Sequence, residues 1–458
     1  MKNMKKYIND KNIVIVAFIL IFLFSNIIFP AGIAGGNYYE YSSGGFVQGS
    51  ANEYQMVFGF NSVEPQSYYS GTMNWILRPL SKAFSAIDIR VLGTVYFLIV
   101  LCFFAFFIRQ MEFSKKWHGI LFEFLALFVF GDFSYLLHFN IMTTQGLLLC
   151  SLLVMTLILM IQYHIKAYML LNVVYGFLCV FVGGLSEGWF ILGILLSLLI
   201  LPTFVVRSDK KYLITSGVVM VVSIGLITSL FSGGVSKQIK TDNLTNATFY
   251  GIYKDNKTTD LNNEKMPKEY LKAYSGKSNF EIEDKVKESK EFKKAVGQYS
   301  YSDILNFYLK NPSLFKDKLE ITAGNAFEIR ARYLANYPYG GLKNGFTLYS
   351  SLKRRFMQPS LWFVLVVSLV TAVFCGINIK KEKNKSVKCH YIYMIMMSFI
   401  SLFAFVAPII ISGEALISEN LFCYNILFDI LFVNIVVGGF VIASARRDKL
   451  REQYGVNQ

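Results

Sequence analysis

Five acidic residues lie inside or at the edge of long apolar stretches of this chain: Asp132, Glu187, Glu414, Glu419 and Asp429. An ionisable group is costly in or against hydrocarbon, so such residues are expected to be paired or functional. Side by side in a helical bundle, they could line a polar cavity at the membrane edge. The alternative is that Glu187 and Glu414 are exposed turn residues and that Asp429 makes a structural hydrogen bond.

A carboxylate at such an edge can take the proton of an attacking hydroxyl group. We select Asp132 as one candidate base and Glu187 as a candidate substrate-binding residue. A second candidate base, Glu40, follows the aromatic pair Tyr38-Tyr39, and flat aromatic rings can stack on sugar rings. The competing interpretation is that these tyrosines favour the membrane interface and that Glu40 is a solvated acid.

Arginine residues supply the candidate phosphate ligands, because a guanidinium fork matches phosphate oxygens. Arg330 and Arg332 lie beside aromatic residues, and Tyr333 and Asn336 of the same segment are further candidate substrate-binding residues. Arg78 belongs to residues 73–87, whose apolar spacing predicts an interfacial amphipathic helix bent at Pro79. Structural salt bridges are the alternative role for these arginines.

The elements that must position these residues are membrane helices. The chain has 458 residues, of which 54% are hydrophobic and 16% aromatic, which is too apolar for one soluble domain of this length. A spanning helix needs about 20 mostly apolar residues. Ten stretches qualify or nearly qualify: 12–31, 91–108, 119–137, 141–162, 168–185, 189–206, 212–231, 358–377, 391–411 and 421–442. The predicted fold class is an all-α integral membrane protein with about ten transmembrane helices.

Lysine and arginine residues predict the orientation of these helices. They follow alternate apolar stretches and are absent from the short turns around 139–140, 184–188 and 412–420. By the positive-inside rule, both termini are cytoplasmic in a multi-pass bacterial cell-membrane protein. The net charge of +15 then needs no nucleic acid as a partner.

This orientation predicts three parts. Residues 1–231 form a transmembrane module of about seven spans with a first extracytoplasmic loop at 32–88. Residues 232–356 form a helical extracytoplasmic loop, and residues 357–458 form a second transmembrane module of about three spans. Within the large loop we expect one solvated helix over 281–297, a helix capped by Ser302-Asp303 and a helix that starts at Asn311-Pro312 and runs toward Tyr337.

Several function classes are disfavoured. The cytoplasmic loops are too short for a nucleotide-binding domain, and no phosphate-binding glycine loop of the G-x-x-x-x-G-K-[ST] type occurs. The six cysteines and four histidines show no metal-ligand spacing and imply no disulfide framework. No cofactor is required, although a second carboxylate holding a divalent metal (Mg²⁺ or Mn²⁺) stays open. Substrates must already be at the outer face, which favours lipid-linked ones.

Short motifs along nearly the whole chain resemble the multi-pass hexose transferases of bacterial S-layer and surface-glycan synthesis, in the GT-C class. They are Phe84 to Gly93, Gly131 to Tyr135 with Phe139-Asn140, Asp303 to Tyr308 with Asn311-Pro312, Arg332 to Tyr337, and Gly413-Glu414-Ala415 with Leu421-Phe422 and Asn425 to Asp429. The resemblance implies a GT-C-like architecture. It also implies transfer of a sugar from a polyprenyl-phosphate donor to a glycan or lipid-linked acceptor.

The chain departs from the family pattern at three places. The first outer loop of the family has an acid near Gly36 or Asn37, whereas here the nearest is Glu40; Gln145 and Asn420 replace an acidic and a basic position. A divergent or inactive member therefore stays open. A surface-polysaccharide polymerase, a transporter or flippase, and an inactive scaffold are the alternative functions.

Overall fold

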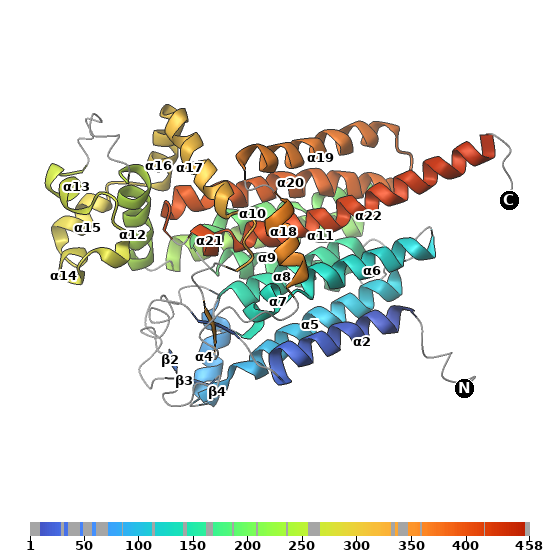
Figure 1. The fold of residues 1–458 in the computed structure, drawn as a ribbon, viewed down its shortest axis with the longest axis horizontal. Coiled ribbons are helices and arrows are strands. Elements are labelled where there is room, and N and C mark those ends of the chain that lie inside the picture. Colours follow the sequence, from blue (N-terminus) through green and yellow to red (C-terminus); the bar gives the residue numbers. More distant parts are fainter. Residues whose placement is uncertain are drawn as a thin grey trace.

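The computed structural model describes most of the chain. The described residues are 10–28, 32–34, 46–48, 57–60, 72–84, 86–111, 115–140, 144–161, 168–185, 187–207, 209–234, 237–254, 266–330, 335–337, 347–357, 360–415 and 417–453. They form a bundle of apolar helices with a smaller group of polar helices at one end (Figure 1). The prediction of a predominantly helical, multi-pass membrane protein is confirmed at this level.

The bundle contains eleven labelled α-helices. They are α2 (Asp10–Phe22), α5 (Ile89–Gln110), α6 (Lys116–Phe130), α7 (Phe133–Leu136), α8 (Thr144–Ile161), α9 (Tyr168–Gly183), α10 (Phe190–Leu198), α11 (Lys210–Gly234), α19 (Leu361–Lys381), α20 (Lys385–Ser412) and α22 (Phe422–Gln453). The π-helix η1 (Leu23–Ile28) extends α2, and three 3₁₀-helices extend or precede bundle helices: η2 (Leu137–Asn140), η3 (Glu187–Trp189) and η4 (Leu201–Val205).

Six of these helices, α5, α8, α11, α19, α20 and α22, are long and apolar enough to cross a membrane. A seventh candidate is bent, because α6 and the α7–η2 segment meet at 58°. The three remaining predicted stretches hold shorter apolar helices, over Ile13–Ile27, Tyr168–Gly183 and Phe190–Val205. Each of the ten predicted stretches therefore contains a helix, but the number of complete spans stays a prediction.

Burial distinguishes the centre of the bundle from its rim. In α8, 72% of the apolar window is buried, compared with 17% in α11 and 22% in α19. Small residues permit the closest contacts: a Cβ atom built on Gly193 of α10 would lie 2.6 Å from the Cα atom of Gly183 in α9. Membrane helices pack in this way because hydrocarbon gives no hydrophobic drive for association, so close backbone approach is favoured.

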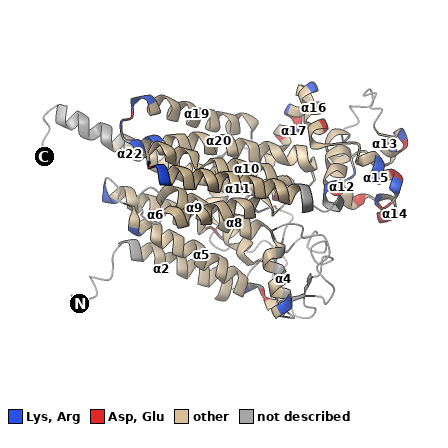
Figure 2. Ribbon diagram, turned by 180° about the vertical axis from the view of Figure 1, so that it is seen from behind, with Lys and Arg blue, Asp and Glu red and all other residues tan. Residues whose placement is uncertain are grey.

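The polar helices lie at the end opposite to the start of α2 and the end of α22 (Figure 1). They are α12 (Lys237–Thr245), the π-helix η5 (Asn246–Ile252), α13 (Lys268–Tyr274), η6 (Asn279–Glu281), α14 (Asp284–Lys287), α15 (Lys290–Val296), α16 (Tyr301–Lys310) and α17 (Pro312–Asn325). Acidic and basic residues are mixed in this group, whereas lysine and arginine dominate the opposite end of the bundle (Figure 2).

Local capping corrects two helix predictions in this group. The helix expected over 281–297 is divided, because Ser289 begins a new helix by accepting a hydrogen bond from the Phe292 N–H. The cap of α16 is Ser300, whose hydroxyl group and backbone N–H form a capping box with Asp303, so the predicted cap at Ser302 is wrong. Pro312 does start α17, as predicted, but the helix ends at Asn325 and residues 335–337 form a strand, so the predicted continuation toward Tyr337 is wrong.

Short strands and helices connect the outer segments. Strand β1 (Gly32–Ala34) pairs antiparallel with β5 (Ala335–Tyr337), with Ile33 opposite Asn336. A second sheet has the order β2–β3–β4, over Phe46–Gln48, Val57–Phe60 and Ala86–Asp88. The remaining helices are α4 (Asn74–Ala83), α18 (Leu348–Phe356) and α21 (Ile417–Asn420). Helix α4 is shorter than the predicted helix over 73–87, because residues 86–88 form β4.

Candidate functional site

A glycine turn at the end of α20 brings a carboxylate into contact with the polar helices. Gly413 has φ 59° and ψ −138°, a conformation that is strained for residues with a side chain. A Cβ atom there would lie 2.8 Å from the Gly251 Cα atom of η5. The next residue, Glu414, donates its backbone N–H to the Tyr250 carbonyl oxygen at 3.4 Å. The turn therefore fixes the Glu414 side chain between the bundle and the polar helices.

Two lysines hold this carboxylate, and we call Glu414, Lys254 and Lys318 the Glu414 clasp. Lys318 of α17 is fully buried and donates to Glu414 Oε1 at 2.5 Å. Lys254, just after η5, pairs with Oε2 and lies over the Tyr250 ring, 4.2 Å from its centroid. Although partial burial opposes it, the hydrogen bond and charge of Glu414 raise the pKa of Lys254.

The clasp borders a polar cavity of about 590 Å³. Ligand pockets for small molecules have volumes of this order. The lining residues combine carboxylates, amide and hydroxyl groups with two aromatic rings: Tyr250, Ser278, Phe280, Glu281, Gly324, Asn325, Glu328, Glu414, Ala415, Ile417 and Ser418. These groups are suited to a polyhydroxylated ligand, because hydroxyl groups both donate to carboxylates and accept from amides.

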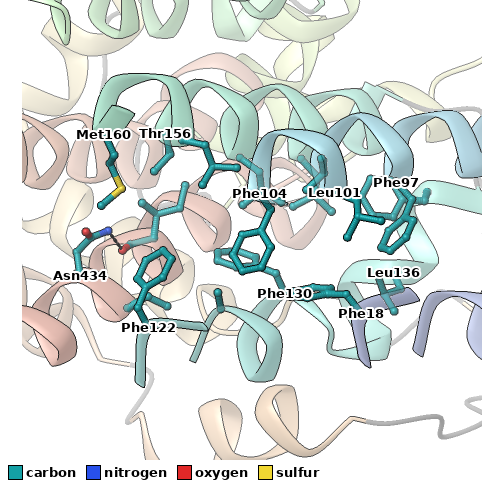
Figure 3. A pocket seen from close by; sticks show the side chains of 18 residues that line it. Phe18, Phe97, Leu101, Phe104, Phe122, Phe130, Leu136, Thr156, Met160 and Asn434 are labelled. Atoms are coloured by element: carbon teal, nitrogen blue, oxygen red, sulfur yellow. Dashed lines mark hydrogen bonds between the residues drawn. The ribbon is translucent and has the colours of Figure 1, made fainter. Parts of the chain in front are cut away.

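A second, smaller cavity lies within the bundle, between α2, α5, α6, α8 and α22. Phe18, Phe97 and Leu136 lie near one end and Met160 and Asn434 near the other (Figure 3). Its volume is about 70 Å³. The Asn434 amide donates to the Ile430 carbonyl at 2.7 Å, so it is already bonded within α22. The cavity is a small apolar void between membrane helices, far below the size of a sugar site.

A buried ionic network joins α18 to the bundle. Lys353 of α18 and Asp429 of α22 are both fully buried, with Nζ 2.7 Å from Oδ1. Asp429 also accepts from the hydroxyl groups of Tyr349, at 2.6 Å, and Tyr135, at 2.5 Å. Lys353 makes another bond to Asn425 Oδ1 at 2.8 Å. Buried charges need this degree of pairing, so the network is a fixed structural unit.

Comparison with known protein families decides the relationship of the chain. The family model described as the YfdI N-terminal transmembrane domain matches residues 2–456. The chain belongs to this family. Comparisons with curated proteins and with solved structures give no match.

In this YfdI-family chain, Asp132 has a capping position. It is fully buried. Its Oδ1 accepts from the Ser134 N–H at 2.8 Å, at the start of α7, and its Oδ2 accepts from the Ser350 N–H of α18 at 2.9 Å. Both oxygens are therefore engaged with backbone groups, and Asp132 does not line either cavity described above.

Arg330 is the one predicted arginine whose side chain is described. Burial lowers its pKa, and the charge of Asp132 opposes that effect. The structure therefore brings Arg330 into the electrostatic field of Asp132. The nearby His138 ring lies 3.3 Å from the Ile329 carbonyl oxygen, so this part of the chain packs tightly on η2.

The other predicted residues are only partly placed. Glu40, Arg332 and Tyr333 lie outside the described residues. Arg78 belongs to α4, Glu187 to η3 and Asn336 to β5, but their side chains are not described. In the β1–β5 ladder Ala34 is opposite Ala335.

Sequence reasoning missed three lysines and one tyrosine: Lys254, Lys318, Lys353 and Tyr349. They belong to the predicted polar loop at 232–356, and nothing local distinguishes them from exposed residues. The predicted convergence of acids is seen only in part, because Glu414 lines the cavity while Asp429 is enclosed in the network. Among the described residues, no group of three His, Cys, Asp or Glu side chains could hold a metal ion.

Proposed function

We propose that this chain is a membrane glycosyltransferase. It would move a sugar from a polyprenyl-phosphate-linked donor to a glycan or lipid-linked acceptor at the membrane surface. The observation that carries the proposal is the Glu414 clasp: a carboxylate held by two lysines at the edge of a 590 Å³ polar cavity. The cavity lies where the apolar bundle meets the polar helices, so a lipid-linked substrate can reach it from the bilayer.

The clasp contains the groups that this reaction needs. The acceptor oxygen bonds to the anomeric carbon as the bond from that carbon to the donor phosphate breaks. The proton of the acceptor hydroxyl passes to Glu414, and the electron pair of the broken bond leaves with the phosphate. Lys254 is 29% exposed and stabilises the phosphate charge, whereas the fully buried Lys318 keeps Glu414 in place.

Glu414 therefore replaces Asp132 and Glu40 as the first candidate base. Asp132 accepts two backbone hydrogen bonds, and it fits the role of a positioning residue that joins α7 to α18. Glu40 stays a second candidate base, because it lies outside the described residues. The phosphate role expected for Arg330 and Arg332 stays part of the proposal.

The test is complementation of a strain that lacks the gene, followed by analysis of surface-glycan composition. Wild type should restore one missing sugar, and Glu414→Gln should not, while Glu288→Gln is the matched control because Glu288 is an exposed acid of the polar helices. If Glu414→Gln restores the sugar, Glu414 is not the base. Glu40→Gln and Asp132→Asn then test the two other candidate bases. Shortened chains of unchanged composition would favour a polymerase, and no change at all would overturn the proposal.

A further inference from the structure

Helix α18 has its polar face directed inward. Tyr349 and Lys353 are 3% and 1% exposed and bond to Asp429, and the Ser350 N–H bonds to Asp132. Residues 349 and 353 are one turn apart and share a face, so this face is committed to the ionic network. In Figure 1 the helix crosses the face of the bundle at an angle to the long helices, close to α6.

The outward face of α18 is divided along its length. One stripe is apolar and follows the i, i+4, i+8 spacing: Leu348, Leu352 and Phe356, which are 51%, 37% and 71% exposed. The adjacent stripe holds Ser351, Arg354 and Arg355, which are also exposed. The sequence of the helix, LYSSLKRRF, contains no acid, so no charge on α18 itself neutralises these arginines.

A helix with this division fits the boundary between hydrocarbon and headgroups. The apolar stripe can enter the acyl region while the basic stripe faces phosphate groups. Helices α6 and α19 also expose apolar side chains, because Phe124 of α6 and Trp362 at the start of α19 are 57% and 65% exposed. If water surrounded α18, the apolar stripe of Leu348, Leu352 and Phe356 would be exposed to solvent.

We propose that α18 is an interfacial helix that binds the anionic headgroups of membrane phospholipids. Arg354 and Arg355 contact headgroup phosphates, and Leu348, Leu352 and Phe356 lie among the acyl chains. The occupant is assigned by charge complementarity, since two exposed arginines on a helix that contains no acid, beside an apolar stripe, match an anionic lipid and not a neutral one. The bonds to Asp429 and Asp132 attach the inward face of α18 to the buried network, so the network fixes the depth of this helix in the membrane. This inference does not depend on the proposed function.

The test combines lipid counting with a depth measurement on the full chain. Native mass spectrometry from mixed phosphatidylglycerol and phosphatidylcholine should show several-fold fewer retained phosphatidylglycerol molecules for Arg354→Gln/Arg355→Gln than for wild type. Lys310→Gln/Lys316→Gln removes two exposed charges from α16 and α17 and should keep the wild-type count. If both double variants retain equal numbers of phosphatidylglycerol molecules, the proposal is overturned. Arg354 and Arg355 would then act only as cations that stabilise the C-terminal end of α18.

Depth is measured with a spin label at Leu352→Cys in a Cys102→Ser background, since the other described cysteines are buried. The label should be more accessible to oxygen than to an aqueous nickel complex, and a label at Ser351→Cys should show a smaller ratio. Greater accessibility of residue 352 to the nickel complex would place α18 in water and contradict the proposal, even if the protein folds normally.

Discussion

At the scale of single residues, burial separates acids that look alike in the sequence. Asp132, Glu414 and Asp429 all lie inside or at the edge of apolar stretches, yet one caps backbone groups, one borders a cavity and one neutralises a buried lysine. The sequence predicts that such acids are paired or functional. It cannot select the partner, because Lys353 lies 76 residues before Asp429 and pairs with it only in the folded chain.

The first prediction concerns this pair. Asp429→Asn leaves the Lys353 charge buried without a counter-ion, and removal of one partner of a buried pair costs about 3–5 kcal/mol. We expect a clear drop in the unfolding midpoint of the purified protein in detergent. Replacement of both residues, Lys353→Met with Asp429→Leu, should recover part of the loss. The exposed Asp317→Asn serves as the control. A wild-type midpoint for Asp429→Asn would show that the network does not stabilise the fold.

The second prediction concerns the pH dependence of the Glu414 clasp. The pKa of Lys254 in the folded protein lies above its ordinary value of 10.5. The stabilisation from this shift is therefore complete below pH 10.5 and is lost as the pH rises through the folded pKa. The difference in unfolding midpoint between wild type and Lys254→Gln should be constant below pH 10.5 and shrink above it. Lys285→Gln, at an exposed lysine, should show no such trend; a difference that grows with pH would contradict the assignment.

At the scale of elements, apolar runs predict helices well and their ends less well. Each of the ten predicted stretches contains a helix, because twenty apolar residues in hydrocarbon must satisfy their backbone groups internally. The stretch at 119–137 is bent, since Asp132 caps a new helix there. The division of 281–297 at Ser289 was not expected. Opposite charges four residues apart favour one continuous helix, and a single serine among them is a weak signal for a new helix start.

The third prediction concerns the Gly413 turn. Gly413→Ala places a side chain at φ 59°, with the Gly251 backbone 2.8 Å from the new Cβ atom. Such a conformation costs about 1–3 kcal/mol, and the clash adds to it by separating η5 from the turn. Stability should fall, and transfer activity should fall with it. Gly439→Ala is the matched control: nothing lies within 4 Å of its Cβ position in α22, so stability should be unchanged or rise by up to about 1 kcal/mol. Equal stability of the two variants would contradict the role of the turn.

At the scale of the whole molecule, the site is assembled from distant segments. The cavity takes residues from η5, η6, α17 and the α20–α21 turn, which are spread over residues 250–418. The β1–β5 ladder likewise joins residues 32–34 to residues 335–337. Sequence patterns predicted the apolar and polar parts and, among these elements, helices α17 and α20, but not η5, η6 or α21. Three-residue strands and contacts between separate loops leave no periodic signal, so the cavity and the ladder could not be predicted.

The fourth prediction concerns orientation. The lysine and arginine end of the bundle should face the cytoplasm and the polar helices should face outward. Single cysteines at Lys293 in α15 and at Lys383 between α19 and α20, in a Cys102→Ser background, test this with a membrane-impermeant maleimide on intact cells. Residue 293 should react and residue 383 should react only after lysis. The opposite pattern would exclude an outer-face reaction at the cavity.

Transfer by the purified protein tests the central claim most directly. The full chain is reconstituted in vesicles with a polyprenyl-phosphate-linked sugar and an oligosaccharide acceptor, and the initial rate of sugar transfer is measured. We predict that wild type and Glu288→Gln transfer at the same rate and that Glu414→Gln is slower by about 10²–10⁴-fold, the usual contribution of a general base. A Glu414→Gln protein that is folded and transfers at the wild-type rate would contradict the account.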